Sequence, residues 1–266
     1  MSKSTKRNMM SLQAILMIVL GFVLIFFILT ATILYTVYDR SLVDYIQGIG
    51  REKPQVVVDE PDPVNPALLL ETNADKGYTD SLWMLSDAYT EEMKTLDISL
   101  RDRCFSTSFV STTNYMEVVF TGNGEESYTL TEFLTATTPK YLLLNFSGTG
   151  LTMDNDAVKL LYQAVLDVIW QHSPESTVIL SGPLPVCGDN ALHTAKVLQL
   201  DETLCKLAQS NNEKGKSAYY LPSPTTFFEG DKTLKKEYIS EKNTVNALGC
   251  EVYFNYVLRH PVPDQQ

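Results

Sequence analysis

Groups that could act as a catalytic base are scarce in this sequence. The 266 residues contain three histidines, and the patterns GxSxG, HExxH, GxxxxGK[ST] and GxGxxG are absent. His172 ends a predicted helix beside Pro174 and His260 lies near the C-terminus, so a solvated role is the simpler interpretation for both. His193 follows a predicted strand on the side where a site would form, although a surface histidine fits there too. Short motifs therefore identify no active site.

Metal-binding cysteine patterns are also lacking. The four cysteines form no CxxC pair, and no histidine stands at ligand spacing from them. We therefore expect no metal and no cofactor. Outside the cytoplasm an even number of cysteines permits disulfides, with three possible pairings. Cys187 with Cys205 is the favoured pair because the two bracket one loop–helix segment, whereas Cys104 and Cys250 fit buried thiols equally well.

Positive charge is sparse, which bears on the partners. The chain has 21 basic and 32 acidic residues, a net charge of −11. The first 40 residues carry +3, so the remainder carries −14. A field of this sign repels phosphate backbones, and no stripe of Lys and Arg is visible, so nucleic acid is not an expected partner.

One long apolar run stands near the N-terminus. Residues 12–37 contain no charged residue, and about 20 such residues suffice for a helix to cross a bilayer. The run is too long for the apolar region of a cleaved signal peptide. Lys3, Lys6 and Arg7 precede it without an acid, so we expect residues 1–11 in the cytoplasm and the rest outside it. The sequence thus predicts a single-pass membrane protein anchored by residues 12–37.

The region after this run divides into a linker and a folded domain. Residues 38–77 read as a stalk, because residues 51–66 contain four prolines among acids and lack helical periodicity. Residues 78–260 alternate short apolar stretches with amphipathic ones, and residues 261–266 form a tail. The predicted strands are Leu82–Leu85, Met116–Phe120, Tyr141–Phe146, Thr177–Ser181 and Ala218–Leu221.

Helices are predicted between and after these strands, over Asp156–His172, Ala191–Asn211 and Asn246–Arg259, the last beginning with an asparagine cap. Strand–helix alternation of this kind predicts a three-layer α/β domain with a mainly parallel, five-stranded sheet. Sites in such sheets form at the carboxyl ends of the strands.

Four segments, in order, resemble the conserved blocks of the SGNH (GDSL-type) hydrolases. Residues 80–90 (DSLWMLSDAYT) resemble the first block, in which a strand ends in Gly-Asp-Ser and the serine is the nucleophile. Residues 139–149 (PKYLLLNFSGT) resemble the strand that carries the Gly-x-Asn block, and residues 173–185 (SPESTVILSGPLP) the strand ending in a Leu-Pro turn. Residues 238–249 (YISEKNTVNALG) resemble the last block, usually Asp-Gly-x-His before a helix. The resemblance implies the SGNH-hydrolase fold over about residues 78–260.

The departures from these blocks concern the catalytic residues. Ala88 stands at the position of the nucleophile, in Ser86-Asp87-Ala88. The family's Gly and Asn fall on Phe146 and Gly148, and its final Asp and His fall on Glu241 and Thr244. Alanine has no attacking atom and threonine cannot accept a proton near neutral pH. Ser86 could be a displaced nucleophile, but a helix cap after the first strand is the simpler interpretation.

The resemblance therefore favours a membrane-anchored, extracytoplasmic pseudoenzyme of the cell envelope. The cleft that matches the family's active site would bind an envelope glycan or protein, since relatives act on acylated cell-wall or polysaccharide components. The candidate cleft comprises Ser86, Asp87, Ala88, Gly148, Thr149, His193 and Thr244. Two alternatives stay open: an active esterase or acyltransferase that uses other residues, and a structural spacer domain in a membrane complex.

Overall fold

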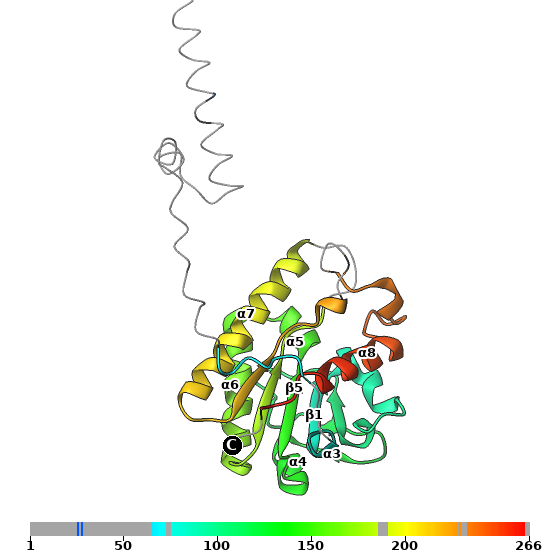
Figure 1. Ribbon diagram of the computed structural model, residues 1–266, viewed down its shortest axis with the longest axis vertical. Helices are drawn as coiled ribbons and strands as arrows, with labels where there is room; N and C mark the ends of the chain where they lie inside the picture. Colours follow the sequence, from blue (N-terminus) through cyan, green and yellow to red (C-terminus); the bar gives the residue numbers. More distant parts are fainter. Residues whose placement is uncertain are drawn as a thin grey trace, which may run out of the picture. The chain divides into compact units, whose positions relative to one another are not determined.

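The computed structural model describes residues 65–72, 76–185, 191–227, 229 and 233–263, together with Phe26 and Ile28 (Figure 1). The chain divides into two compact units, residues 1–62 and 63–266. Of the first unit only Phe26 and Ile28 are described, and both are helical. The rest of the predicted membrane segment 12–37, like the N-terminal residues 1–11, lies outside the described residues. Within the described ranges, no helix has both the length and the apolar character needed to cross a membrane.

The second unit is built on a seven-stranded sheet. Its strand order is β4-β3-β2-β1-β5-β6-β7, and the five strands from β2 to β7 in that order are parallel. The short β3 and β4 continue the sheet antiparallel. The strands are β1 (Leu82–Asp87), β2 (Cys104–Thr107), β3 (Phe120–Thr121), β4 (Ser127–Tyr128), β5 (Tyr141–Asn145), β6 (Thr177–Ser181) and β7 (Ala218–Leu221). The mainly parallel α/β fold is confirmed, and the expected number of five strands is corrected to seven.

Four of the five predicted strands are present and one is wrong. Residues 112–117 form turns, and the predicted strand Met116–Phe120 contributes only its last residue, to the antiparallel β3. The fifth parallel strand is instead β2, whose four residues are all buried. This strand ends in Ser106 and Thr107 and contains no apolar run, so its burial comes from its position beside β1 and not from its composition.

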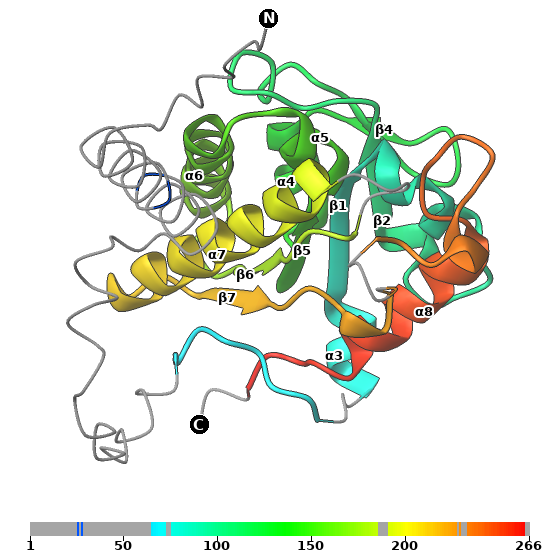
Figure 2. The same cartoon turned by 90° about the horizontal axis from the view of Figure 1, so that it is seen from above.

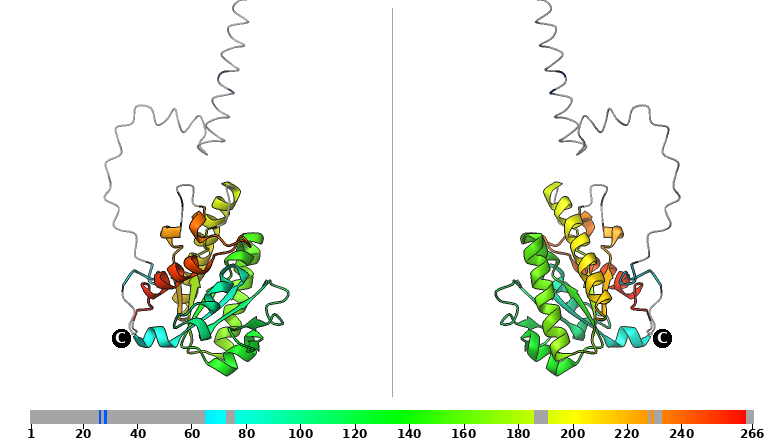
Figure 3. Two further views of the ribbon diagram at one scale, coloured as in Figure 1. Left: turned by 90° about the vertical axis from the view of Figure 1, so that its right-hand side faces the viewer. Right: turned by 90° about the vertical axis from the view of Figure 1, so that its left-hand side faces the viewer.

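Helices cover both faces of the sheet (Figures 2 and 3). The α-helices are α3 (Lys76–Ser81), α4 (Leu130–Thr137), α5 (Ser147–Thr152), α6 (Asn155–His172), α7 (Ala191–Glu213) and α8 (Ala247–Leu258). Short 3₁₀ helices are η1 (Ala88–Thr95), η2 (Arg101–Arg103), η3 (Thr225–Phe227) and η4 (Lys236–Tyr238). The three predicted helices correspond to α6, α7 and α8. The predicted cap of α8 is confirmed, because the backbone N–H of Gly249 donates to Asn246 Oδ1 at 2.9 Å.

The strand residues alternate between two hydrophobic cores. Leu142 and Leu144 of β5 face the core under α4, α6 and α7, whereas Leu143 faces the core under α3, η1 and α8. Strands buried on both faces read as continuous apolar runs, which is why β5 and β6 could be recognised in the sequence.

The packed body extends beyond residues 78–260 at both ends. Ala67 and Leu69, in the stretch that the sequence analysis assigns to the stalk, are buried. The Leu69 N–H donates to the Tyr220 carbonyl at 2.9 Å, and the Tyr220 N–H donates to the Ala67 carbonyl at 2.7 Å. This stretch therefore runs beside the edge strand β7. Val262, assigned to the tail, is also buried in the core under α8.

Candidate functional site

Three segments meet around Tyr89 at the carboxyl end of the sheet. The Tyr89 N–H donates to Asp87 Oδ1 at 3.0 Å, and its carbonyl accepts from the Val245 N–H at 3.1 Å. A Cβ added to Gly148 would lie 3.2 Å from the Cβ of Tyr89 and 3.3 Å from both Asp87 carboxylate oxygens. The backbone at Gly148 therefore passes close to Asp87 and Tyr89. The half-buried Ala88 begins η1 beside this point. The structure thus brings the segments of Ala88, Gly148 and Thr244 together.

The ring of Tyr89 spans this meeting point. Its hydroxyl donates to the carbonyl of Pro185, in the segment that follows β6, at 2.5 Å. Only 7% of Tyr89 is exposed. The side chain of Tyr89 therefore connects η1, which follows β1, to the segment after β6, two strands away in the sheet.

Asp87 anchors the backbone at this edge. Its side chain caps η1 through Tyr89, and its Oδ2 accepts from the Thr149 N–H of α5 at 2.7 Å. The residue is 1% exposed, and desolvation raises the pKa of its carboxyl group, opposed by these backbone hydrogen bonds. The expectation that Ser86 caps the helix is corrected by one residue. Ser86 lies within β1, fully buried, with its hydroxyl near the Cys104 thiol.

The remaining predicted positions are Phe146, Glu241, Thr244 and His193. Phe146 is fully buried, and its ring packs against Phe120 and Tyr162. Glu241 is exposed in a turn. Thr244 lies in the same turn, with its hydroxyl 2.8 Å from the Ser240 hydroxyl. His193 lies in the first turn of α7, and its side chain is outside the described part of the structure.

Sequence reasoning missed a buried polar network beneath this edge. Ser147 Oγ donates to Asn145 Oδ1 at 2.5 Å, and Asn145 Nδ2 donates to the Tyr253 hydroxyl at 3.0 Å. The Tyr253 hydroxyl lies 2.6 Å from Ser181 Oγ, which itself donates to the Gly182 carbonyl. Because the Ser181 hydroxyl donates its proton to Gly182, the Tyr253 hydroxyl is the donor to Ser181. Each group in this series of hydrogen bonds therefore donates to the next one, from Ser147 to Gly182. Asn145 and Ser181 were detectable as polar residues that end apolar strands.

Among the described residues, Cys104, Cys205 and Cys250 form no disulfide with one another. Burial raises the pKa of Cys104 to about 12 and also raises that of Cys250. Cys205 is half-buried, and its sulfur accepts from Asn65 Nδ2 at 3.4 Å. Cys187 lies outside the described residues, so its pairing with Cys205 stays a prediction. No group of three or more potential ligands that could hold a metal occurs in the described ranges.

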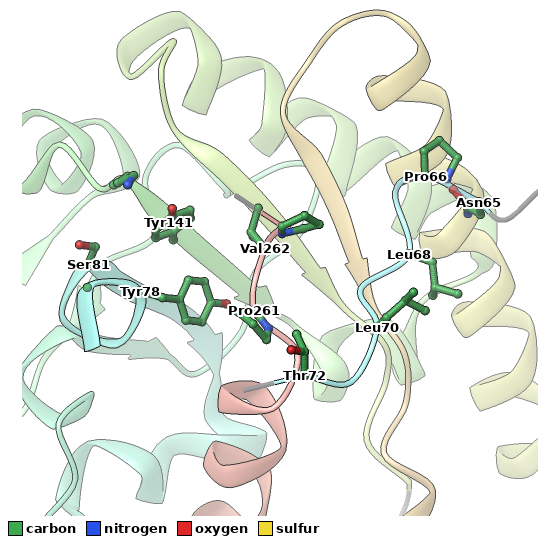
Figure 4. Close-up of a pocket in the computed structure, with 13 residues that line it drawn as sticks. Asn65, Pro66, Leu68, Leu70, Thr72, Tyr78, Ser81, Tyr141, Pro261 and Val262 are labelled. Atoms are coloured by element: carbon green, nitrogen blue, oxygen red, sulfur yellow. The ribbon is translucent and has the colours of Figure 1, made fainter. Parts of the chain in front are cut away.

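A cavity of about 590 Å³ lies at the opposite, amino edge of the sheet (Figure 4). Its walls come from residues 65–72, α3, the start of β5 and residues 261–263. The rings of Tyr78 and Tyr141 lie 4.9 Å apart on one side, and Pro261 and Val262 line it from the C-terminal segment. None of the predicted site residues lines this cavity.

Comparison with known proteins supports the fold. No protein-family model and no curated protein matches the chain. Among solved structures, a predicted acylhydrolase from Bacteroides fragilis is 14% identical, with a TM-score of 0.52, covering 77% of this chain and 96% of its own. A GDSL-like lipase from Bacteroides thetaiotaomicron is 9% identical, with a TM-score of 0.48, covering 69% of this chain and 88% of its own. The chain is similar in structure to SGNH (GDSL-like) esterases and lipases, at identities that establish the fold alone.

Proposed function

We propose that this protein is a membrane-anchored, extracytoplasmic domain of the SGNH-hydrolase fold that binds an envelope glycan or protein and lacks esterase chemistry. One observation supports the proposal: Ala88, which the sequence resemblance aligns with the family's serine, directly follows β1, and its neighbours Asp87 and Tyr89 contact Gly148 and the end of the 240–245 turn. An alanine methyl group cannot form the covalent acyl intermediate that the family's mechanism requires.

The surroundings of Ala88 support the same conclusion. Thr244, at the position of the general base, has its hydroxyl beside that of Ser240, and an alcohol cannot accept a proton near neutral pH. Phe146, at the position that the resemblance gives to an oxyanion-hole residue, is buried, and its backbone N–H already donates to the Tyr162 hydroxyl at 3.0 Å. Removal of a serine-hydrolase nucleophile alone costs on the order of 10⁶ in turnover, so the combined changes leave no esterase activity to expect.

Labelling with a fluorophosphonate probe and hydrolysis of an activated ester test this proposal on the purified full-length chain. We expect no stoichiometric labelling and no turnover above the uncatalysed rate. The matched variant Ala88→Ser should stay equally inactive, because restoring a hydroxyl supplies no base. Stoichiometric labelling of the natural chain, or turnover abolished by Ser86→Ala or His193→Ala, would replace the proposal with an active esterase or acyltransferase.

The proposed location rests on the uncharged run 12–37 and the basic residues before it. Protease added to intact cells should remove the domain and leave a short anchored fragment. Full protection of the chain beyond residue 40 would reverse the proposed orientation. Because this experiment reads topology alone, its outcome is independent of the esterase assay.

A further inference from the structure

The turn between β3 and β4 contains the only Asn-Gly pair in the sequence, Asn123-Gly124. Both residues are exposed, and they lie in a bend across which the Gly122 N–H donates to the Glu126 carbonyl at 3.0 Å. Exposed turns of this kind open locally at little cost in free energy. The pair is therefore accessible to water, and its backbone can change conformation while the rest of the sheet stays folded.

The two glycines of this turn differ in what surrounds them. A Cβ added to Gly122 would lie 2.9 Å from Cε1 of the Phe105 ring, so packing requires a glycine there. A Cβ added to Gly124 would meet no atom within 4 Å, and its φ lies outside the left-handed region that favours glycine. Neither packing nor backbone conformation therefore requires a glycine at position 124. Its effect is instead to leave a backbone nitrogen that no side chain shields.

The nitrogen of Gly124 has no competing partner. Among the residues that the structure describes, none accepts a hydrogen bond from the Gly124 N–H. The preceding side chain places an electrophilic carbon, Cγ of Asn123, where attack by this nitrogen closes a five-membered ring. A side chain on the following residue would obstruct that attack, and glycine has none.

We propose that Asn123 is a site of spontaneous deamidation, which converts it to aspartate and isoaspartate in the folded protein. The Gly124 nitrogen loses its proton to solvent and forms a bond to Cγ of Asn123. The Cγ–Nδ2 bond breaks, the departing nitrogen takes up a proton, and ammonia leaves a cyclic imide behind. Water then breaks one of the two bonds from the imide nitrogen to carbon. Breaking the bond to Cγ gives aspartate, and breaking the bond to the main-chain carbonyl carbon gives isoaspartate.

The conversion would remove a contact between the turn and η2. The Asn123 side chain donates a hydrogen bond to the carboxylate of Asp102, which also pairs with Arg101 at 3.0 Å. A carboxylate at position 123 has no proton to donate near neutral pH, and it repels the carboxylate of Asp102. Glu125 and Glu126 add further negative charge in the same turn. Deamidation should therefore release the β3–β4 turn from η2.

Incubation of the purified full-length protein, followed by peptide mapping with mass spectrometry, tests the proposal. We expect the peptide that contains Asn123 to gain the mass of one amide-to-acid conversion and to accept a methyl group from a protein isoaspartate methyltransferase. Conversion should be slower at mildly acidic than at neutral pH, because the Gly124 nitrogen must lose its proton. Its rate in the folded protein should lie within about tenfold of the rate in urea, because the turn opens locally.

Matched variants separate this site from general ageing of the chain. Gly124→Ala should slow conversion by about tenfold or more, because the added methyl group obstructs the attack, and the open space there lets the variant fold. Asn114 is the internal control, because it also lies in a turn but precedes tyrosine, and it should stay intact. Asn123→Asp reproduces one product and should speed hydrogen exchange of the Gly122 N–H. Thermal unfolding of each variant verifies that the fold is kept.

Three results would overturn the proposed site: no conversion at Asn123 in the natural chain, equal rates in the natural chain and in Gly124→Ala, or equal conversion at Asn114. Unchanged hydrogen exchange in Asn123→Asp would overturn the proposed release of the turn. Neither readout depends on the esterase assay, so the deamidation site and the proposed function can fail separately.

Discussion

The two edges of the parallel sheet differ in how their polar groups are used. At the carboxyl edge, Asn145, Ser181 and Tyr253 hydrogen-bond to one another below the surface, and Asp87 holds the backbone of two helices. At the amino edge, prolines, leucines and tyrosines surround a cavity of about 590 Å³ (Figure 4). The carboxyl edge, where sites form in parallel α/β sheets, is therefore rich in hydrogen bonds within the protein.

Polar side chains at the carboxyl ends of the strands are therefore not by themselves evidence of catalysis. Buried polar groups are costly unless they are paired, and here the pairing is among the protein's own residues. The carboxyl edge should therefore respond to substitution with changes in stability. The amino edge should respond only where its residues are buried.

The largest effect at the carboxyl edge is expected for Asp87, because burial of its ionised carboxyl group removes the hydration of that group and so costs free energy. Burial raises its pKa above the ordinary 3.8, so the folded state binds this proton more tightly than the unfolded state does. The stability of the natural chain relative to Asp87→Asn should therefore be greatest below pH 3.8 and fall as the pH rises through the raised pKa. Urea unfolding of both proteins at several pH values measures this difference in the free energy of unfolding, and Asp156→Asn, at an exposed position, is the control. A difference that does not change with pH would contradict the prediction.

The polar network should be the next most sensitive feature. Asn145→Leu leaves the Ser147 hydroxyl and the Tyr253 hydroxyl without their partner, which should lower the free energy of unfolding by about 3 kcal/mol. The control is Asn155→Ala. The side-chain amide of Asn155 forms hydrogen bonds with Gln199 and Lys196 near solvent, so this substitution should change the free energy of unfolding by less than about 1 kcal/mol. Equal effects in urea unfolding would mean that the network does not support the carboxyl edge.

Adjacent leucines test the amino edge. Leu69 is 2% exposed and Leu70 is 60% exposed, although they follow one another in the strand-like segment beside β7. Leu69→Ala should destabilise the protein by about 2–4 kcal/mol through the cavity that it leaves. Leu70→Ala should be neutral within about 0.5 kcal/mol. If both substitutions were neutral, residues 65–72 would belong to the stalk and not to the folded body.

The smallest expected effect is at the cap of α8, which follows the 240–245 turn of the carboxyl edge. Asn246→Ala removes the acceptor for the Gly249 N–H and should cost about 1 kcal/mol. Leu248→Ala in the same first turn changes a half-exposed side chain and serves as the control. A loss for Asn246→Ala no larger than that of the control would show that the cap does not stabilise this end of the helix.

The candidate site could be predicted from the sequence only in part. The resemblance of four separated blocks places Ala88, Gly148 and Thr244 near one another, and the structure brings these three segments together around Tyr89. Neither Tyr89 nor Tyr253 was singled out, because their bonds join residues that are 96 and 108 positions apart. No local pattern records such a partner.

Elements with a local signal could be predicted from the sequence alone. Apolar runs specified β1, β5, β6 and β7, helical periodicity specified α6, α7 and α8, and Asn246 specified the start of α8. Contacts between distant segments explain three further features: Cys104–Thr107 is a strand inside the sheet, residues 65–72 run beside the edge strand β7, and Asp87 rather than Ser86 caps η1. These features depend on which distant segment satisfies a backbone or side-chain group. That choice is made by burial and hydrogen bonding across the fold, and it leaves no periodic pattern along the chain.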